Sequence, residues 1–238
     1  MNLKKILILG ASSDIGLKTI DLFLAHNWKV YAHYNKESKK LTSLKKNYKN
    51  LNLIKLEFKN NKNIEKKVKK SFNHGYHSII NLIGYIDNKS FANTKLKDTL
   101  ESISINALIP NLILRNNLGF MLREKWGRIV NGSALGIPYG GGEHSFNYNL
   151  SKHCLEFIPG KFRDWAKQNI LINNLRIGHT NTKIHKKMKK TIFGSRRINL
   201  IPINRMATKK EMAEYLFFMA TEKNSFMTNE TISATGGE

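Results

Sequence analysis

Tyr148 and Lys152 are the two residues of this chain whose types and spacing point most directly to chemistry. They lie four positions apart, close to one turn of a helix, so both side chains can face the same ligand. Ser133, in the pair Gly132-Ser133, precedes Tyr148 by 15 positions. A phenol beside an ammonium group can pass a proton to an oxygen atom, and a hydroxyl can hold that oxygen in place. Together these groups predict redox chemistry at a carbonyl or an alcohol.

A glycine-rich turn near the start of the chain indicates that a nucleotide takes part in that chemistry. Residues 6–9 are apolar and predict a buried strand, residues 10–16 read GASSDIG, and a helical pattern follows. Glycine permits a tight turn, and the free N–H groups of a helix N-terminus attract the phosphates of a nucleotide. The turn predicts a dinucleotide cofactor bound by Gly10, Ser12, Ser13, Asp14, Ile15 and Gly16. An ordinary turn between a strand and a helix is the other interpretation.

The end of the second predicted strand favours one form of the cofactor. Residues 33–36 read HYNK and include no acid, whereas a carboxylate there would bind the ribose 2′-hydroxyl of NAD. Lys36 could pair with a 2′-phosphate, and Ser12 and Ser13 could donate hydrogen bonds to it. We therefore expect NADP(H) rather than NAD(H). The alternative is that Lys36 is one more surface lysine.

Apolar and amphipathic segments alternate along the whole chain. The predicted strands cover residues 6–9, 29–34, 53–58, 78–83, 127–131, 170–175 and 230–233, and the predicted helices cover residues 15–26, 36–48, 64–73, 96–117, 148–168 and 209–220. Pro110 interrupts the helical stretch 96–117, and the helix 148–168 must absorb Pro159-Gly160. This alternation predicts an α/β fold: a single doubly wound parallel-sheet Rossmann domain, residues 1–238, with helices on both faces. Ligands of such sheets bind at the carboxyl ends of the strands, where this chain gathers glycines and small polar residues.

Length and composition narrow the class of protein. The 238 residues suffice for one α/β core, and no apolar run reaches the ~18 residues that a membrane span needs. Cys154 is the single cysteine, which fits a reducing compartment. We expect a cytoplasmic protein without a membrane span and without a metal ion.

A formal net charge of +23 is the most unusual property of the composition. An anionic partner is one explanation, and lysines spread over solvated helix faces are the other, which we favour for most of the chain. We do not expect nucleic acid as a partner, because no zinc-finger spacing or RNA-binding aromatic signature accompanies the lysines. The stretch 183–205 differs, since it has eight Lys or Arg residues and no acid.

Several ordered motifs resemble those of the short-chain dehydrogenase/reductase family, in its classical type, over essentially the whole length. Residues 10–16 are similar to its glycine motif, residues 81–84 (NLIG) to its Asn-Asn-Ala-Gly motif, and residues 132–136 (GSALG) to its serine motif. Residues 173–178 resemble an Asn-x-x-x-Pro-Gly segment, and residues 227–237 resemble the closing Thr-Gly-Glu and Gly-Gly pattern. The resemblance implies an NAD(P)-dependent oxidoreductase.

The resemblance also implies roles for individual residues. It implies a catalytic tetrad of Asn106, Ser133, Tyr148 and Lys152. Tyr148 would exchange the proton and Ser133 would polarise the reacting oxygen, while Lys152 would hold the nicotinamide ribose. Asn106 would bind a water molecule that relays protons. An ammonium ion one turn away favours a phenolate, so we expect Lys152 to lower the pKa of Tyr148. The other predicted cofactor contacts are Tyr34, Asn35, Lys36, Glu57, Phe58, Asn81, Gly84, Gly178, Thr180 and Thr182, beside Tyr148 and Lys152 themselves.

Three departures from the family pattern affect the site. Asp14 replaces a glycine of the loop, and at a helix start it can cap free N–H groups rather than face a pyrophosphate. Ile177 replaces a proline in the loop that covers the nicotinamide. The interval from Ser133 to Tyr148 is slightly longer than usual, and residues 140–142 (GGG) can absorb the difference.

In this family the segment after Thr182 is a variable lid over the substrate. Here it is the basic stretch 183–205, with Gly194 as a candidate hinge. A basic lid suits an anionic substrate: a nucleotide-sugar, an acidic or phosphorylated sugar, or a phosphopantetheine-borne acyl chain on an acidic carrier protein. The candidate substrate contacts are His144, Arg176 and His179.

Three functions fit the sequence. The first is an NADP(H)-dependent oxidoreductase that reduces a carbonyl, or oxidises the matching alcohol, on a polar or anionic small substrate. The second is a 3-oxoacyl-carrier-protein reductase of the fatty-acid type. The third is a non-catalytic nucleotide-sensing or nucleic-acid-binding protein, against which the intact tetrad argues.

The family resemblance also implies a homodimer or homotetramer. Members commonly pair through the helices that here carry Asn106 and Tyr148. The apolar residues of those helices are compatible with such pairing and equally with an internal core; they are Ile105, Leu108, Leu112, Leu155 and Phe157.

Overall fold

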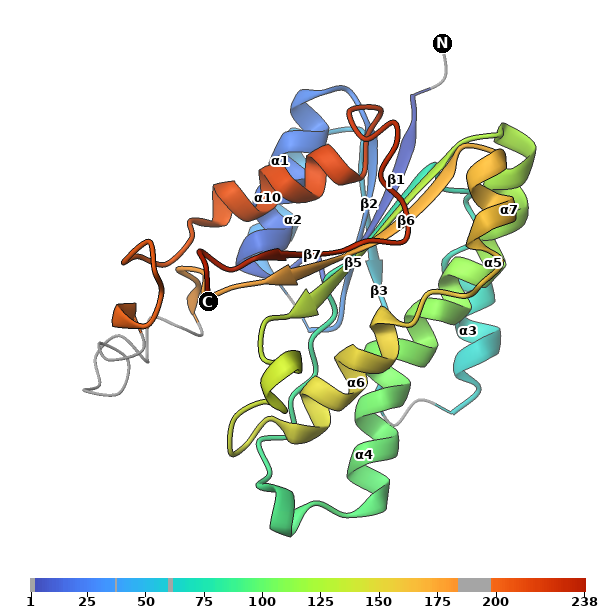
Figure 1. The fold of residues 1–238 in the computed structure, drawn as a ribbon. Helices are drawn as coiled ribbons and strands as arrows, with labels where there is room; N and C mark the ends of the chain where they lie inside the picture. Colours follow the sequence, from blue (N-terminus) through green and yellow to red (C-terminus); the bar gives the residue numbers. More distant parts are fainter. Residues whose placement is uncertain (1–2, 37, 60–61, 184–197) are drawn as a thin grey trace.

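A parallel β-sheet runs through the middle of the molecule (Figure 1). The computed structural model describes residues 3–36, 38–59, 62–183 and 198–238. Within them the strands are β1 (Lys5–Leu9), β2 (Lys29–Tyr34), β3 (Leu51–Lys55), β4 (Ser78–Asn81), β5 (Gly127–Ala134), β6 (Ile170–Ile177) and β7 (Thr231–Ala234). Neighbouring strands pair in parallel in the order β3-β2-β1-β4-β5-β6-β7. The predicted doubly wound parallel sheet is confirmed.

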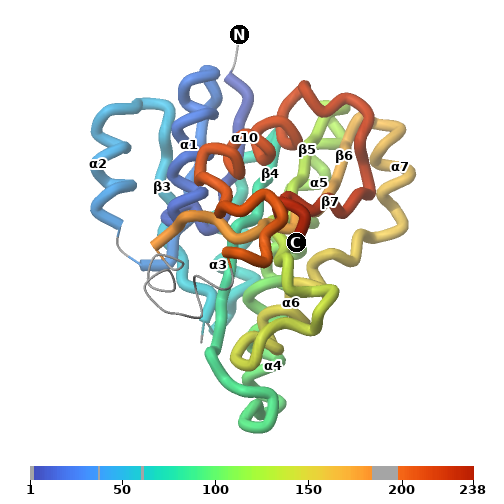
Figure 2. Tube along the Cα trace, turned by 60° about the vertical axis from the view of Figure 1, so that its left-hand side comes forward, coloured from blue at the N-terminus to red at the C-terminus, as the bar shows by residue number. Residues whose placement is uncertain are grey.

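Helices cover both faces of this sheet (Figure 1, Figure 2). They are α1 (Asp14–Ala25), α2 (Lys39–Asn47), α3 (Ile64–Ser71), α4 (Leu96–Ile103), α5 (Ile109–Glu124), α6 (Phe146–Glu156), α7 (Phe162–Lys167) and α10 (Lys209–Met219). One apolar core joins α1, α2 and α10 to one face, and a second joins α3, α5 and α7 to the other. In β1, Ile6 and Ile8 lie in the first core while Leu7 and Leu9 lie in the second. Strands covered on both faces read as continuous apolar runs for this reason.

Two predicted helical stretches that contain a proline are each divided in the structure: the interruption expected in 96–117 is present, and the helix expected to run through 148–168 is broken. The helix predicted over residues 96–117 is α4, then a π-helical turn η2 (Ser104–Leu108), then α5. Pro110 has no N–H to donate to the carbonyl of Asn106 four residues earlier, and the first turn of α5 tolerates it. The next predicted helix is likewise two helices, because Pro159 lies in the break between α6 and α7.

The carboxyl ends of β1 and β4 meet at the centre of the sheet, where the order of strands reverses. From β1 the chain continues outward to β2 and β3, whereas β4 begins the other half. The amide of Leu82, just after β4, donates to the carbonyl of Leu9 at the end of β1 at 2.9 Å. Such a switch point is where open α/β sheets bind their ligands.

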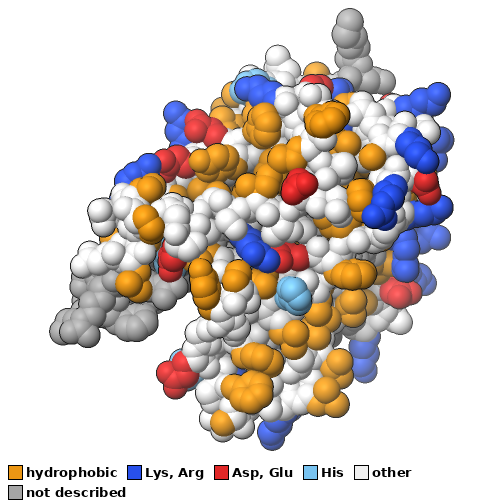
Figure 3. All heavy atoms as spheres, in the orientation of Figure 1, with side chains coloured by type: hydrophobic (Ala, Val, Ile, Leu, Met, Phe, Trp, Pro, Cys, Tyr) orange, Lys and Arg blue, Asp and Glu red, His pale blue; other side chains and the backbone are white. Residues whose placement is uncertain are grey.

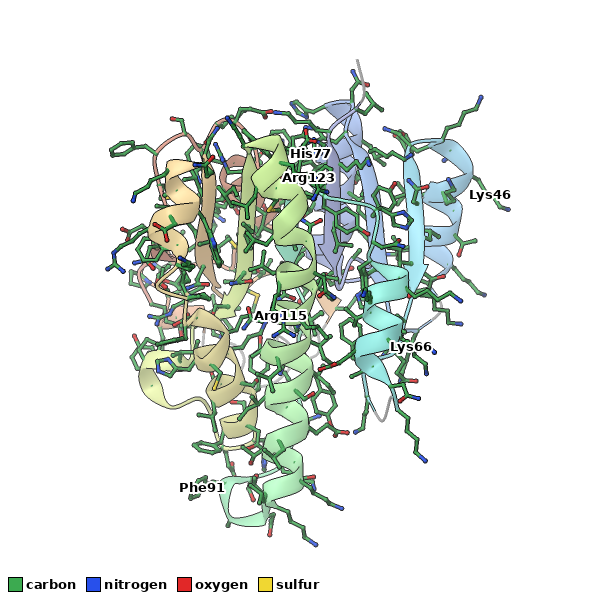
Figure 4. The ribbon with its side chains drawn as sticks, turned by 90° about the vertical axis from the view of Figure 1, so that its right-hand side faces the viewer. Lys46, Lys66, His77, Phe91, Arg115 and Arg123 are labelled. Carbon is green, nitrogen blue, oxygen red and sulfur yellow. The ribbon has the colours of Figure 1, made fainter. Side chains whose placement is uncertain are left out.

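Lysine and arginine side chains lie on helices, strands and loops alike. Lys46 on α2 and Lys66 on α3 are both exposed (Figure 4). On the face shown in Figure 3, Lys and Arg side chains gather along one edge and elsewhere alternate with hydrophobic and neutral side chains. In the part of the chain that the structure describes, no helix combines the length and apolar character needed to cross a membrane.

Candidate active site

Helix α6 brings Tyr148 and Lys152 to the carboxyl ends of β4 and β5. The Lys152 side chain is buried, and its Nζ donates to the carbonyl oxygens of Ile83, at 2.6 Å, and Gly132, at 2.7 Å. The same Nζ lies 5.8 Å from the centre of the Tyr148 ring. A Cβ built on Gly84 would lie 3.8 Å from the phenol oxygen, an ordinary contact distance, so the phenol lies directly against this glycine. The predicted pair is therefore brought together at the strand ends.

Burial sets the charge state of both groups. It raises the pKa of Tyr148 to about 12 and lowers the pKa of Lys152 to about 7, while the carboxylate of Glu156 acts on Lys152 in the opposite direction. The pKa of Tyr148 thus shifts in the direction opposite to the one expected from a neighbouring amine, because burial of the phenol is the cause of the shift. At neutral pH Tyr148 is a protonated phenol, the form that can donate a proton.

The hydroxyl of Ser133 donates its proton to a carboxylate that we did not predict at this site, that of Glu156. This hydroxyl, on β5, donates to Oε1 of Glu156 at 2.7 Å. Arg176, opposite Ser133 on β6, donates to the same carboxylate from Nε at 2.8 Å and from Nη2 at 2.7 Å. Two expectations change as a result. The Ser133 proton is directed at Glu156, and Arg176 is engaged by an internal carboxylate rather than open to a substrate. The position of Glu156, four residues after Lys152 on one helix, is the signal that could have revealed it.

The side chain of Asn106 secures the segment that follows β4. Its Oδ1 accepts from the amide of Tyr85 at 2.8 Å. Its Nδ2 donates to the carbonyl of Tyr85 at 2.9 Å and to the hydroxyl of Ser151 at 2.8 Å. Both polar atoms of the Asn106 side chain, a predicted member of the tetrad, are therefore hydrogen-bonded to other residues of the protein. Pro110, four residues later, has no N–H to donate to the backbone carbonyl of Asn106.

The glycine loop after β1 makes the close approaches that its sequence predicts. Gly10 has a φ of +71°, and a Cβ there would lie 2.6 Å from the carbonyl oxygen of Leu82. A Cβ on Gly16 would lie 2.7 Å from the carbonyl oxygen of Ala11. Only glycine fits at either position without moving the backbone.

The hydrogen bonds of this loop show which of its amides remain for a phosphate group. The amides of Gly10 and Ala11 donate to His33, and the amide of Ser13 donates to the carbonyl of Gly10. The amide of Gly16 donates to the hydroxyl of Ser13. Among the described residues no acceptor contacts three amides at the start of α1, those of Ser12, Asp14 and Ile15. The loop therefore fits a pyrophosphate group at a helix N-terminus.

The carboxylate of Asp14 is directed away from that phosphate site. It accepts from the amide of Lys183 at 2.8 Å and lies 3.5 Å from Nζ of Lys209 on α10. Burial alone would raise the pKa of Asp14, but the Lys183 amide and the charge of Lys209 together hold it below its ordinary value. Only the backbone amide of Asp14 faces the phosphate site, so the predicted cofactor contact of this residue is limited to that amide.

The residues predicted to hold the adenosine end divide into exposed and buried ones. Three are exposed beyond β2 and β3, namely Asn35, Lys36 and Glu57. Tyr34 is half-buried and packs against the first core. Phe58 is buried, and its ring stacks on His33 with 4.6 Å between the ring centres. The Phe58 side chain is a core residue, so its predicted cofactor contact is limited to the backbone.

The residues predicted at the nicotinamide end follow β4 and β6. Asn81 is 2% exposed, and its Nδ2 has no hydrogen-bond partner in the described part of the chain. Gly178 lies against Thr235, since a Cβ there would lie 2.6 Å from the Cα of Thr235. Thr180 is buried and donates to the carbonyl of Gly178 at 2.9 Å, and Thr182 is half-buried. A buried amide without a partner is a group that a bound ligand can satisfy.

The predicted substrate contacts are mostly engaged by acids of the chain itself. Nδ1 of His179 lies 2.8 Å from Oε2 of Glu238, and both side chains are nearly buried. His144 is exposed, and its Nε2 lies 3.7 Å from a carboxylate oxygen of Glu143. Most of the predicted lid, including the predicted hinge Gly194, lies outside the described residues.

The parallel sheet, the glycine loop at its switch point and the buried Tyr148–Lys152 pair together define a Rossmann-type oxidoreductase. A family model described as enoyl-(acyl carrier protein) reductase matches residues 10–238, which is nearly the whole chain. The chain belongs to the short-chain dehydrogenase/reductase family and is an oxidoreductase of that family.

Named relatives and a solved structure are similar to this chain. FabG of Aquifex aeolicus, a 3-oxoacyl-[acyl-carrier-protein] reductase, is 28% identical over 178 residues, which cover 70% of this chain and 71% of the relative. An acetoacetyl-CoA reductase of an Acinetobacter species is 27% identical over 161 residues, covering 67% and 64%. A crystal structure of a 3-oxoacyl (acyl-carrier-protein) reductase from Agrobacterium tumefaciens C58, with NADP bound, matches with a TM-score of 0.87 at 19% identity, over 99% of this chain and 94% of that chain. The last similarity is one of fold.

Proposed function

We propose that this protein is an NADP(H)-dependent reductase of 3-oxoacyl thioesters, in which Tyr148 donates the proton. The observation that carries the proposal is the placement of Tyr148: its phenol lies against Gly84, and the buried amine of Lys152 lies 5.8 Å from the centre of its ring. Carbonyl reduction needs an acid at the carbonyl oxygen, and a protonated phenol is such an acid. The same geometry would serve the reverse oxidation of an alcohol only after the phenol has lost its proton.

The cofactor would lie along the carboxyl edge of the sheet. The open amides of Ser12, Asp14 and Ile15 would bind its pyrophosphate, and Nδ2 of Asn81 would meet its nicotinamide end. The absence of an acid among residues 33–36 and the exposed Lys36 support NADP(H) over NAD(H). When bound, the reduced nicotinamide supplies the hydride.

The protein's own residues handle the proton. Tyr148 releases its phenol proton to the carbonyl oxygen as that oxygen becomes an alkoxide. Lys152, whose pKa burial lowers to about 7, can return a proton to Tyr148 near neutral pH. Its bonds to two carbonyl oxygens hold Nζ in place during this exchange. The carbonyl of Asn106 then offers an acceptor for a water molecule that reprotonates Lys152.

Ser133 must change partner to take part in this reaction. A hydroxyl has one proton, and in this structure the proton of Ser133 is donated to Glu156. To stabilise a carbonyl oxygen, Ser133 would turn its O–H from the carboxylate to the substrate. The carboxylate keeps two N–H donors from Arg176, so it is not left unpaired by that change.

Two observations favour a 3-oxoacyl thioester over a small anionic substrate. Arg176 and His179, the residues expected to bind a substrate carboxylate, are paired with Glu156 and Glu238. The relatives from Aquifex and Acinetobacter are named for the reduction of 3-oxoacyl and acetoacetyl thioesters. A carbonyl group on an acidic or phosphorylated sugar is the second candidate, and the basic stretch 183–205 supports it.

Cofactor binding and turnover test the proposal in sequence. NADPH and NADH are titrated by fluorescence into the wild type and into Lys36→Ala, and we expect tight NADPH binding that weakens in the variant. Acetoacetyl-CoA and a set of phosphorylated keto-sugars are then compared as oxidants of NADPH, with Tyr148→Phe as the inactive control. Turnover of the sugars alone would move the substrate assignment to the second candidate, and binding of neither nucleotide would refute the proposal.

We further propose that two copies pair through the helices that carry Asn106 and Tyr148, with Leu108 at the end of η2 and Phe157 just after α6 at the interface. Those side chains are 58% and 80% exposed, which leaves them available to a partner. Ile105 and Leu155 are buried within the chain, so they belong to its core rather than to an interface. We expect light scattering to give a dimer or a tetramer, and a monomeric mass at micromolar concentration would contradict the pairing.

A further inference from the structure

His33 is a buried residue near the end of β2 whose polar contacts lead to the glycine loop. It is 3% exposed. Its Nδ1 accepts from the amide of Gly10 at 3.3 Å, and its Nε2 lies 2.8 Å from the carbonyl oxygen of Leu56. Its backbone carbonyl accepts from the amide of Ala11 at 2.8 Å. One residue therefore holds two consecutive amides of the loop.

These contacts permit a single protonation state of the ring. A backbone amide donates, so Nδ1 must be the acceptor, and a carbonyl oxygen accepts, so Nε2 must carry the proton. A second proton on Nδ1 would oppose the amide of Gly10, and burial in any case lowers the pKa of His33 to about 4. The ring cannot turn easily, because Phe58 stacks on its face and Phe72 meets its edge with 5.6 Å between the ring centres.

The consequence for the loop is a division of its amides. The two amides bound by His33 are directed into the protein, which leaves the amides of Ser12, Asp14 and Ile15 at the start of α1 for a ligand. The turn at Gly10, with φ of +71°, is held from both sides: by His33 and by the backbone of Leu82. Without an acceptor in place of Nδ1, the amide of Gly10 would be buried without a partner, and the turn would relax to satisfy it.

We infer that His33 is a positioning residue for the cofactor, which holds the first turn of the glycine loop in the conformation that binds a pyrophosphate. It touches no ligand itself and acts through Gly10 and Ala11. Like the proposed function on which it rests, this role requires that the loop bind a nucleotide.

Two substitutions separate the two sides of the ring. His33→Asn retains an amide oxygen near the position of Nδ1, whereas His33→Gln retains an amide N–H near the position of Nε2. We expect NADPH binding, measured by fluorescence titration, to weaken about tenfold in His33→Gln and to stay within about threefold of the wild type in His33→Asn, as loss of one buried hydrogen bond implies. Phe72→Leu is the control, because it removes packing beside the ring without touching a hydrogen bond of the loop.

Thermal unfolding of the same proteins distinguishes positioning from general stability. We expect all three variants to melt at lower temperature, and only His33→Gln to lose affinity. Equal affinity in His33→Gln and wild type, or an equal loss in Phe72→Leu, would show that His33 is a core residue only. If His33→Gln does not fold, the test depends on His33→Asn. This variant retains an acceptor for the amide of Gly10, so a tenfold loss of its affinity for NADPH would overturn the role of His33. A wild type that binds neither NADPH nor NADH refutes the proposed function, whereas normal binding by wild type and by His33→Gln refutes the role of His33 alone.

Discussion

The hydroxyl of Ser133 donates to the carboxylate of Glu156 at 2.7 Å, and Arg176 holds that carboxylate with two N–H groups. Ser133 cannot donate to a substrate oxygen while it donates to Glu156, because it has one proton. The internal carboxylate and the substrate therefore compete for the same hydrogen bond. The strength of the internal bond then limits the contribution of Ser133 to carbonyl reduction.

Weakening the internal bond tests this competition. In the paired variant Glu156→Gln/Arg176→Gln, a neutral amide oxygen replaces the carboxylate, and its partner Arg176 loses its charge with it. A hydrogen bond to a charged group exceeds one to a neutral group by about 1 kcal/mol, so we expect kcat for reduction to rise up to about fivefold with little change in KM. The same pair introduced into Ser133→Ala should leave kcat unchanged. An equal effect in both backgrounds would mean that Glu156 acts through Lys152 or the fold.

Removal of the phenol hydroxyl should abolish proton donation without harming the cofactor site. We expect Tyr148→Phe to lower kcat by about 10³-fold, within the range for general acid catalysis, and to leave the Kd for NADPH and the melting temperature close to those of the wild type. Steady-state kinetics and fluorescence titration measure these quantities. A variant that retains a tenth of the wild-type kcat would show that another group supplies the proton.

Two glycines with the same backbone conformation make a matched pair for the loop. Gly10 and Gly140 have φ of +71° and +70°, but a Cβ meets the carbonyl of Leu82 only at Gly10, and Gly140 has open space around it. We expect Gly140→Ala to cost about 1 kcal/mol of unfolding free energy from its left-handed conformation alone. Gly10→Ala should cost more and should abolish NADPH binding. Urea unfolding and nucleotide titration of the two variants check this, and equal costs would argue against the close approach.

The buried ring of His33 predicts a loss of stability in mild acid. Burial lowers its pKa from 6.5 to about 4, so the unfolded state binds the proton more tightly than the folded state between those values. The stabilisation from neutral His33 is complete above pH 6.5 and is lost as the pH falls toward 4, by about 3 kcal/mol in all. The free energy of unfolding should fall more steeply over this range in the wild type than in His33→Asn. An equal dependence of the unfolding free energy on pH in the two proteins would contradict the lowered pKa of His33.

The parts of the site that the sequence predicted are those set by local spacing. Tyr148 and Lys152 are one helical turn apart, and the loop from Gly10 to Gly16 lies between a strand and a helix, so chain order alone brings their groups together. The contacts that we missed join distant segments: Glu156 with Ser133, and His33 with the loop. Spacing along the chain carries no information on such pairs.

The pKa values of the site could not be predicted for a related reason. Proximity suggested that Lys152 would favour a phenolate at Tyr148, but burial acts on both groups and reverses the outcome. Phe58 was expected to contact the cofactor, but its side chain is buried in the core. Exposure is a property of the assembled fold and cannot be read from one segment.

Lys152 joins the segments that follow β4 and the end of β5 through the carbonyls of Ile83 and Gly132. A refolding chain can form its central strand pairs before α6 docks, yet it has no acid–base pair until the amine reaches both carbonyls. Recovery of activity during refolding should therefore lag behind recovery of β-sheet signal and coincide with the burial of α6. The rate at which activity returns during refolding therefore reports when α6 docks on the sheet.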